Sequence, residues 1–189
     1  GDSIVGFDCG PGNALMDGWC KAHTGQAYDE GGQWAASGKV HLDLLNHLLN
    51  DAYFSREPPK STGRDLFNAE WLYVRLAQYP ELPPADVQAT LTELTAASCA
   101  ACVTRYGKES KTLLICGGGA LNTYLMQRLQ AHLTPITVAS TAAAGLPPMQ
   151  VEASAFAWLA RQAVRRETAS FKSVTGAQGA RVLGAIYPA

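Results

Sequence analysis

The sequence predicts an α/β fold in which a mixed sheet is flanked by helices and interrupted by a helical insertion. Three patterns carry this prediction. A short apolar run, SIVGF, ends at an acid and a glycine-rich turn; a second run, KTLLIC, opens into three glycines; and strand-like and helix-like stretches alternate in the second half of the chain. Alternation of this kind is typical of a parallel or mixed sheet with helices packed on it.

Composition suits one soluble globular unit and restricts the class of its ligands. The 189 residues are 47% hydrophobic and 16% charged, with a formal net charge of -1. Because basic residues are not in excess, no field would draw the chain to nucleic acid or to an acidic membrane, and a small polar ligand fits better. No apolar run approaches the roughly 20 residues that a membrane helix needs, and nothing near the start resembles a signal peptide. We expect neither nucleic acid nor a membrane as a partner.

Cysteine usage predicts reduced thiols and a cytoplasmic location. The five cysteines are an odd number without the spacing of a disulfide framework. Cys99 and Cys102 form a C-x-x-C pair, but this pair falls inside a predicted helix among alanines and no second pair follows. Packing of small side chains explains it better than redox or zinc chemistry. The four histidines lack ligand spacing, so no metal site is predicted.

The first predicted unit is a strand, a glycine turn and a helix. Residues 3–7 form the apolar run, and Asp8 stands at its C-terminal end. Gly10 and Gly12 permit the positive φ of a tight turn. Asn13 is placed to cap the helix that follows, in which apolar residues have helical spacing.

A mainly helical segment is predicted at about residues 33–107. Apolar residues recur three and four apart over about 40–50. Further helices are predicted over 68–79 and 84–107, the second of which has a proline in its first turn and ends at Gly107.

Strands return after the helical segment. The continuous apolar run at 111–116 is typical of a strand that is covered on both faces, and it leads into the glycines at 117–119. Asn122 begins the next helix, residues 135–140 predict another strand, and 151–166 predict a last helix. One face of that last helix carries Ala153, Phe156, Ala157, Ala160 and Val164.

The two glycine turns are candidate anion or nucleotide sites. Each precedes the N-terminus of a predicted helix, where backbone N–H groups and the helix dipole favour an anion. Neither turn is a Walker phosphate loop or a dinucleotide fingerprint, because the required lysine and glycine spacing are absent. A role in packing alone stays open for both turns.

Two acids are candidates for catalysis. Asp8, at the predicted strand tip beside a glycine turn, can remain ionised and accept a proton from a bound hydroxyl or water. The alternative is a structural aspartate that accepts bonds from the turn. Glu152 follows the breaker GLPP at the start of a predicted helix, and its alternative is an ordinary acid of a first helical turn.

Lys60 and Arg64 lie four residues apart in the turn-rich loop REPPKSTGRD. They could present two cations to a carboxylate or a phosphate. The alternative, that both are simply solvated, also stays open.

Six ordered motifs give the chain a resemblance to a known family: GFDCGPGNALMDGW, PKSTGRDLFN, LTELTA, ICGGGALNTYLMQRL, GLPPMQVEASAFAWLA and SVTGA. The chain resembles, over essentially all 189 residues, the second half of the anhydro-N-acetylmuramic acid kinases of peptidoglycan recycling. The resemblance implies one lobe of the RNase H-like superfamily of sugar kinases, heat-shock chaperone ATPases and actin. Residues 1–189 would be a single C-terminal lobe, and the N-terminal lobe with the ATP phosphate loop would be absent.

The resemblance also implies an activity. The family is an ATP-dependent sugar kinase that opens 1,6-anhydro-N-acetylmuramic acid with water and phosphorylates it to N-acetylmuramic acid 6-phosphate. Asp8 matches its general base, and Glu152 a glutamate that bonds the sugar. Phosphate-facing residues would be Gly10, Gly12 and Asn13, and nucleoside-facing residues would be Gly117, Gly118, Gly119 and Asn122.

Cofactors and partners follow from the same resemblance. ATP and Mg²⁺ would be held mostly by the missing lobe, so we expect the chain alone to be inactive. The family suggests a homodimer. Three positions depart from the family pattern: Cys9, Leu121 and Lys172 stand where Thr, Arg and Pro are common. Two other functions stay open, a non-catalytic sugar- or nucleotide-binding module and a sugar kinase with another substrate.

Overall fold

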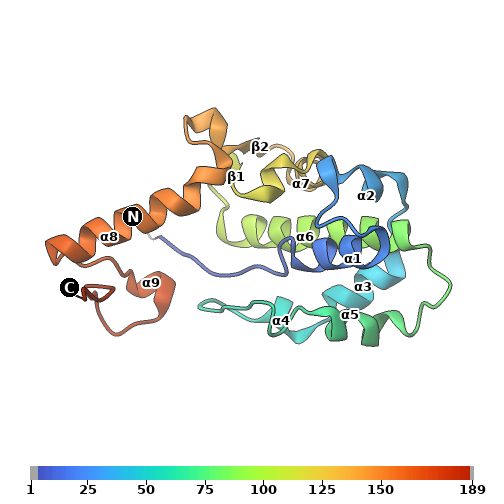
Figure 1. Ribbon diagram of the computed structural model, residues 1–189, viewed down its shortest axis with the longest axis horizontal. Coiled ribbons are helices and arrows are strands. Elements are labelled where there is room, and N and C mark those ends of the chain that lie inside the picture. Colours follow the sequence, from blue (N-terminus) through green and yellow to red (C-terminus); the bar gives the residue numbers. More distant parts are fainter. Residues whose placement is uncertain (1–3, 188–189) are drawn as a thin grey trace.

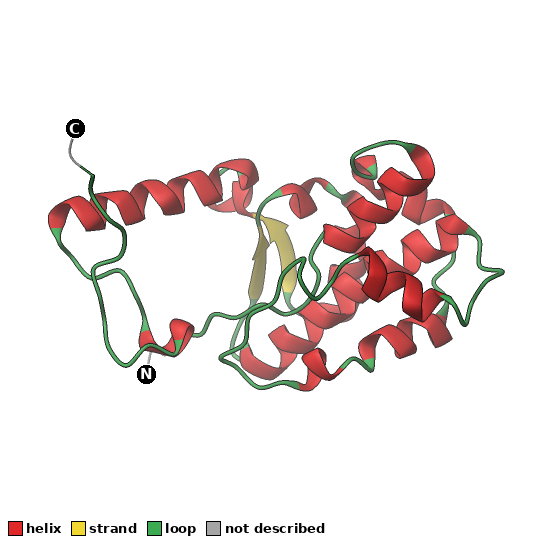
Figure 2. Cartoon of the chain, turned by 60° about the horizontal axis from the view of Figure 1, so that its bottom comes forward, coloured by secondary structure: helices red, strands yellow, loops and turns green. Residues whose placement is uncertain are grey.

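The computed structural model describes residues 4–187 and shows a mostly helical α/β unit with a small parallel sheet (Figures 1 and 2). The α-helices are α1 (Ala14–Thr24), α2 (Gln33–Ser37), α3 (Leu42–Leu49), α4 (Ala52–Ser55), α5 (Ala69–Leu76), α6 (Pro84–Tyr106), α7 (Thr123–Leu133), α8 (Val151–Arg165) and α9 (Lys172–Thr175). The strands are β1 (Thr112–Ile115) and β2 (Thr137–Ser140). Short 3-10 helices are η1 (Glu30–Gly32), η2 (Gly118–Leu121), η3 (Thr141–Ala144) and η4 (Pro148–Gln150).

The long helix α6 is the centre of the molecule. It crosses the body in Figure 1 and contacts α1, α2, α3 and α7. Pro84 occupies its first turn, where a missing N–H costs nothing, and Gly107 follows its last residue, as the sequence predicts. Residues 87–94 of α6 are buried without a break, polar ones included, because neighbouring helices cover several sides of this helix.

The main hydrophobic core lies between α6 and the helices α1, α3 and α5. Apolar residues at helical spacing on each helix point into this core. Its buried members are Leu15, Met16, Trp19, Leu44, Leu45, Leu48, Tyr53, Phe67, Trp71, Leu72, Val87, Leu91 and Leu94. The Trp19 indole N–H also donates to the backbone oxygen of Pro84 at 2.9 Å, which ties α1 to the start of α6.

The sheet consists of β1 and β2, paired in parallel from Thr112 with Thr137 to Ile115 with Ser140. The helix α7 connects the two strands and packs on β2, as expected of a β-α-β unit. The expectation that the first of these strands is covered on both faces is wrong. Exposed and half-buried residues alternate along β1, because within residues 4–187 the helices cover one face of the sheet.

The strand predicted at residues 3–7 is not present in its described part. Ser3 lies outside the described residues, and residues 4–9 form neither strand nor helix. A strand needs a neighbour to receive its backbone hydrogen bonds, and none of the described strands lies beside this segment. The described part of the apolar run is therefore irregular chain.

The helix α8 extends away from the helical body (Figure 1). Its bounds match the prediction over 151–166, but its apolar face is not covered by the described part of the chain: Phe156 is 64% exposed and Val164 is 72% exposed. The predicted helices at about 40–50, 68–79 and 84–107 are confirmed as α3, α5 and α6. Short helices α2 and α4 lack a periodic pattern long enough to predict. Within residues 4–187, no helix is long and apolar enough to cross a membrane.

Candidate functional site

The segment before α1 runs antiparallel to α6. Phe7 packs edge-on against Tyr106 near the end of α6, with ring centroids 5.0 Å apart. Further along, the Thr95 hydroxyl donates to the backbone oxygen of Gly12 at 2.7 Å. Residues 7–12 are thus positioned by the surface of a helix, and not by a sheet.

Asp8 is an exposed carboxylate whose orientation is fixed from one side. Its Oδ2 accepts hydrogen bonds from the Ser61 hydroxyl at 2.7 Å and from the Thr62 backbone N–H at 2.9 Å. The Tyr53 hydroxyl donates to the backbone oxygen of Asp8 at 2.7 Å, and the Asp8 N–H donates to the Lys60 oxygen at 3.3 Å. No described residue donates to Oδ1. Oδ2 therefore orients the carboxylate.

The two glycines of the first turn are required for different structural reasons. Gly10 lies against α6, where a Cβ atom would come within 2.8 Å of the Ser98 hydroxyl. Gly12 has a φ of +56°, and a Cβ atom there would meet nothing within 4 Å. Its backbone is therefore open to a ligand.

Asn13 brings the two glycine turns together. A Cβ atom at Gly118 would lie 3.5 Å from its side-chain nitrogen, and one at Gly119 would lie 3.4 Å from its side-chain oxygen. The prediction that Asn13 caps the first helix is wrong in one respect. The residue precedes α1, but its side chain makes no capping hydrogen bond and turns instead toward the second glycine turn.

The second glycine turn is held at both ends. Gly117 has a φ of +69°, and its N–H donates to the Pro148 oxygen at 2.9 Å. Asn122 begins α7 as predicted, because its Oδ1 accepts the Leu125 backbone N–H at 2.9 Å. A Cβ atom at Gly117 would meet nothing within 4 Å, so the space on that side of the turn is open, although the N–H and C=O of Gly117 are bonded to Pro148 and Ala120.

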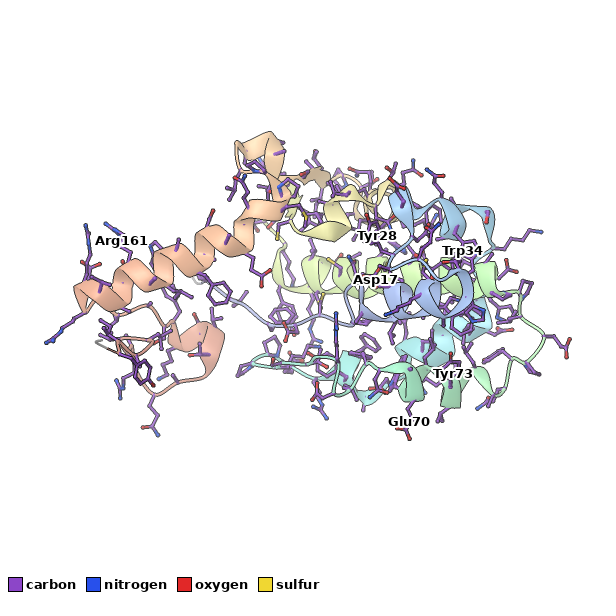
Figure 3. The ribbon with its side chains drawn as sticks, in the orientation of Figure 1. Asp17, Tyr28, Trp34, Glu70, Tyr73 and Arg161 are labelled. Atoms are coloured by element: carbon purple, nitrogen blue, oxygen red, sulfur yellow. The ribbon has the colours of Figure 1, made fainter. Side chains whose placement is uncertain are left out.

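A cleft of about 570 Å³ opens where the two turns meet, between α1, η1, η2 and η4. Of the predicted residues, it is lined by Asn13, Gly118 and Asn122. The lining residues that sequence reasoning missed include Asp17, Tyr28, Asp29, Glu30, Gln33 and Met149. Leu121, which the sequence marks as a departure from the family pattern, also lines the cleft. Figure 3 shows Asp17 and Tyr28 close to one another on this side of α1. The loop AYDEGG carries a signal that could have found Tyr28, Asp29 and Glu30, namely an aromatic and two acids before paired glycines.

The acids make one side of the cleft suitable for hydroxyl groups. Burial raises the pKa of Asp17, with a contribution from nearby Asp29, while Arg64 opposes the shift. Asp29 is occupied, since its two oxygens accept the backbone N–H groups of Trp34 and Ala35 at 2.9 and 2.8 Å. Carboxylates accept hydrogen bonds from hydroxyls and repel phosphates. A ligand in this cleft would direct its hydroxyls to the acids and its anionic part toward the glycine turns.

The remaining predicted residues do not gather at this cleft. Glu152 is exposed in the first turn of α8 and has no hydrogen-bond or ion-pair partner among residues 4–187. Lys60 is occupied by Tyr53, since its ammonium lies 4.7 Å from the ring centroid and donates to the backbone oxygen at 3.2 Å. Arg64 lines a different hollow, beside Asp17. The structure does not bring Lys60 and Arg64 together.

A magnesium site made by this chain alone does not fit the described residues. Across residues 4–187, no three His, Cys, Asp or Glu side chains are grouped so that they could hold a metal ion. The space beside Gly12 and Gly117 is unobstructed, which leaves room for a nucleotide to approach the two turns.

Comparison with known proteins gives one consistent result. The family model described as anhydro-N-acetylmuramic acid kinase matches residues 1–189. A protein of that name from Variovorax paradoxus is 63% identical over 99% of this chain, and one from Albidiferax ferrireducens is 62% identical over 98%. One from Burkholderia orbicola is 53% identical over 98%. The chain spans about half the length of these relatives, 50%, 48% and 50% respectively.

Proposed function

Because the chain belongs to the anhydro-N-acetylmuramic acid kinase family, we propose that it forms the C-terminal lobe of an ATP-dependent sugar kinase. The reaction would convert 1,6-anhydro-N-acetylmuramic acid, ATP and water to N-acetylmuramic acid 6-phosphate and ADP. Water would attack the anomeric carbon, the anhydro bridge would break, and O6 would receive the phosphoryl group. The observation that carries this proposal is the family match over all 189 residues.

We propose that the fold is one lobe of the RNase H-like superfamily. In that arrangement a second lobe would face this one, and nucleotide would bind between the two. Support comes from the mixed helical and parallel-strand architecture, and from the two glycine turns on one side of it.

Asp8 is the proposed general base. One of its oxygens is held by Ser61 and Thr62, while the other has no donor among the described residues. A fixed, exposed carboxylate can take a proton from a water that is placed against the sugar. Glu152 is proposed to hydrogen-bond the sugar; its support is weaker, because it lines none of the cleft described above.

The cleft at Asn13 is the proposed nucleotide site. The nucleoside would lie along Gly117–Gly119 and Asn122, with the apolar side chains of Tyr28 and Met149 available to contact the base. The phosphates would extend toward Gly10, Gly12 and Asn13, away from the acids. Mg²⁺ would be held chiefly by residues outside this chain, since the described residues offer no carboxylate cluster for it. A cytoplasmic location and a homodimer, both implied by the resemblance, remain predictions.

ADP release tests the proposal. We expect the 189-residue chain alone to show no ATP- and anhydrosugar-dependent release. A fusion in which the first half of the Variovorax paradoxus relative precedes this chain should release ADP only when both substrates are present. Calorimetry with the anhydrosugar and with ATP, separately, tests the alternative function, a non-catalytic binding module. If the fusion bound either ligand without releasing ADP, the binding module would be favoured. If the fusion released ADP only with a different sugar, the substrate would be reassigned.

Replacement of the proposed base is the sharper test. Asp8→Asn keeps the acceptor for Ser61 and Thr62 but cannot take a proton. We expect kcat of the fusion to fall by roughly 10²- to 10⁴-fold, with little change in the calorimetric affinity for the sugar. Asp65→Asn is the matched control, since this exposed acid lies in the same loop as Ser61. If Asp8→Asn retained normal kcat, another residue would have to be the base.

A further inference from the structure

The short helix α9, which lies in the SVTGA motif, packs against the segment that carries Asp8. A Cβ atom at Gly6 would lie 2.8 Å from one γ-carbon of Val174 and 3.3 Å from the other, so the Val174 side chain is in direct contact with this glycine. Gly176 follows α9, and a Cβ atom there would lie 3.5 Å from the side chain of Pro59. Figures 1 and 2 show α9 near the first described residues. The motif thus touches both chain segments that lead to Asp8.

These two segments are joined to each other at Asp8. The Asp8 N–H donates to the Lys60 oxygen at 3.3 Å. The Asp8 carboxylate accepts from the Ser61 hydroxyl at 2.7 Å and from the Thr62 N–H at 2.9 Å. Gly6 is two residues before Asp8, so their Cα atoms are at most about 7 Å apart. Because packed atoms transmit a displacement to their neighbours, a shift at Gly6 would move the carboxylate relative to its two donors.

The contact of Val174 with Gly6 is local and lies outside both hydrophobic clusters of the described chain. Val174 is half-buried, and no residue of α9 is fully buried. Truncation of this side chain therefore removes little buried apolar area, and the main consequence is expected at the contact itself. Sequence reasoning could not find the contact, because Gly6 and Val174 stand near opposite ends of the chain.

We propose that Val174 is a positioning residue for Asp8, which packs against Gly6 and thereby holds the Asp8 carboxylate against Ser61 and Thr62. This inference rests on the proposed role of Asp8 as general base. Val174 does not line the cleft at Asn13, so it acts only through the main chain at Gly6. Catalysis by a base depends steeply on the distance between the base and its proton, whereas binding of the sugar does not depend on that distance. Loss of the contact should therefore lower kcat more than it raises KM.

An exchange of side-chain size between positions 6 and 174 tests the contact in the fusion enzyme. Gly6→Ala places a methyl group 2.8 Å from Val174, and kcat should fall by roughly 10- to 100-fold with little change in KM. In the double variant Gly6→Ala/Val174→Ala the new methyl group meets only the β-carbon, at 3.6 Å, which is an ordinary contact. The double variant should therefore recover most of the lost kcat. Val182→Ala is the matched control, since this exposed valine lies in the same tail, and kcat should not change.

The Asp8→Asn background separates positioning from a general loss of folding. If Val174 acts through Asp8, Gly6→Ala should lower kcat no further once the base has been removed. A general loss of folded enzyme would lower kcat in both backgrounds, and circular dichroism measures the folded fraction of each variant.

NMR of the 189-residue chain gives a readout that does not need kinase activity. The Thr62 amide proton is donated to Asp8, so its resonance should move upfield in Gly6→Ala and return in the double variant; Asp8→Ala gives the position expected when the bond is lost. An unchanged Thr62 resonance in Gly6→Ala, or a double variant with no more kcat than Gly6→Ala, would overturn the inference. A normal kcat for Asp8→Asn would instead overturn the proposed base, and the Thr62 resonance would still report whether Val174 positions Asp8.

Discussion

Asn13 is the residue through which two distant parts of the sequence form one cleft. Its side chain lies against Gly118 and Gly119, more than a hundred residues later in the chain. Its position before α1 was predicted correctly, but the partner of its side chain was not. An asparagine before a helix predicts a local cap, whereas the folded chain uses its amide in a contact that no local pattern encodes.

Gly32 tests how closely the cleft is packed. A Cβ atom at this position would overlap the Asn122 side-chain oxygen that caps α7. Gly32→Ala should therefore lower the free energy of unfolding by about 2–4 kcal/mol, from backbone strain at positive φ, overpacking and a weakened cap. Gly25→Ala is the control, since its φ of +77° matches the +72° of Gly32 but its Cβ would meet open space. The control should cost about 1 kcal/mol in urea unfolding. If both variants lowered the free energy of unfolding equally, the Asn122 side chain would have to move aside without cost.

At the scale of elements, a buried ion pair fastens α7 to α6. Glu93 on α6 accepts from Arg128 Nε at 2.6 Å and Nη2 at 3.1 Å, and pairs with His132 at 2.7 Å. Burial would raise the pKa of Glu93, but the hydrogen bonds and charges of Arg128 and His132 outweigh it, and the pKa lies below its usual range. This carboxylate stabilises the fold only in its ionised form.

Glu93→Gln should lower the free energy of unfolding at pH 7 by about 2 kcal/mol, less than for a fully buried pair because Arg128 is partly exposed. A carboxyl with a depressed pKa contributes stability above its unfolded pKa of about 4.3 and loses it as pH falls through the folded value. The difference between wild type and variant should thus shrink as the pH falls below about 4.3. Urea unfolding across pH measures it. Glu70→Gln, on the outer side of α5 (Figure 3), is the control and should change little.

The helices were predictable because their signals are local, and the sheet was less so. Pro84, Gly107 and Asn122 mark helix ends in the sequence, and the structure begins or ends helices beside them. The run at residues 3–7 has the apolar character of a strand, but pairing depends on a neighbour that the described residues do not supply. Contacts between distant segments likewise determine which loop residues line the cleft, so the local sequence around Tyr28 only weakly predicted its place there.

At the scale of the whole molecule, packing is uneven. The main core surrounds α6, while a small second cluster links α6 to α7 and the sheet. Of the described side chains on α8, only Gln162 is buried. Figure 3 places Arg161 far from Asp17 and Tyr28, on the projecting part of that helix.

The rates of amide hydrogen exchange should follow this uneven packing. Amides in the middle of α6 should exchange only through global unfolding, and those of α8 should exchange at least about 10²-fold faster, because few buried contacts hold that helix in the described chain. Exchange measured by mass spectrometry on the 189-residue protein distinguishes the two. Equal protection of α8 and α6 would show that the exposed apolar face of α8 is covered in solution.

The central position of α6 also determines where the chain tolerates an insertion or a break. The helices α1, α2, α3 and α7 all pack against α6, so a chain break inside α6 would disrupt the packing of all four. Inserted tags, new termini or two-piece complementation should therefore succeed in the exposed turn around Gly145 and fail anywhere between Val87 and Leu94.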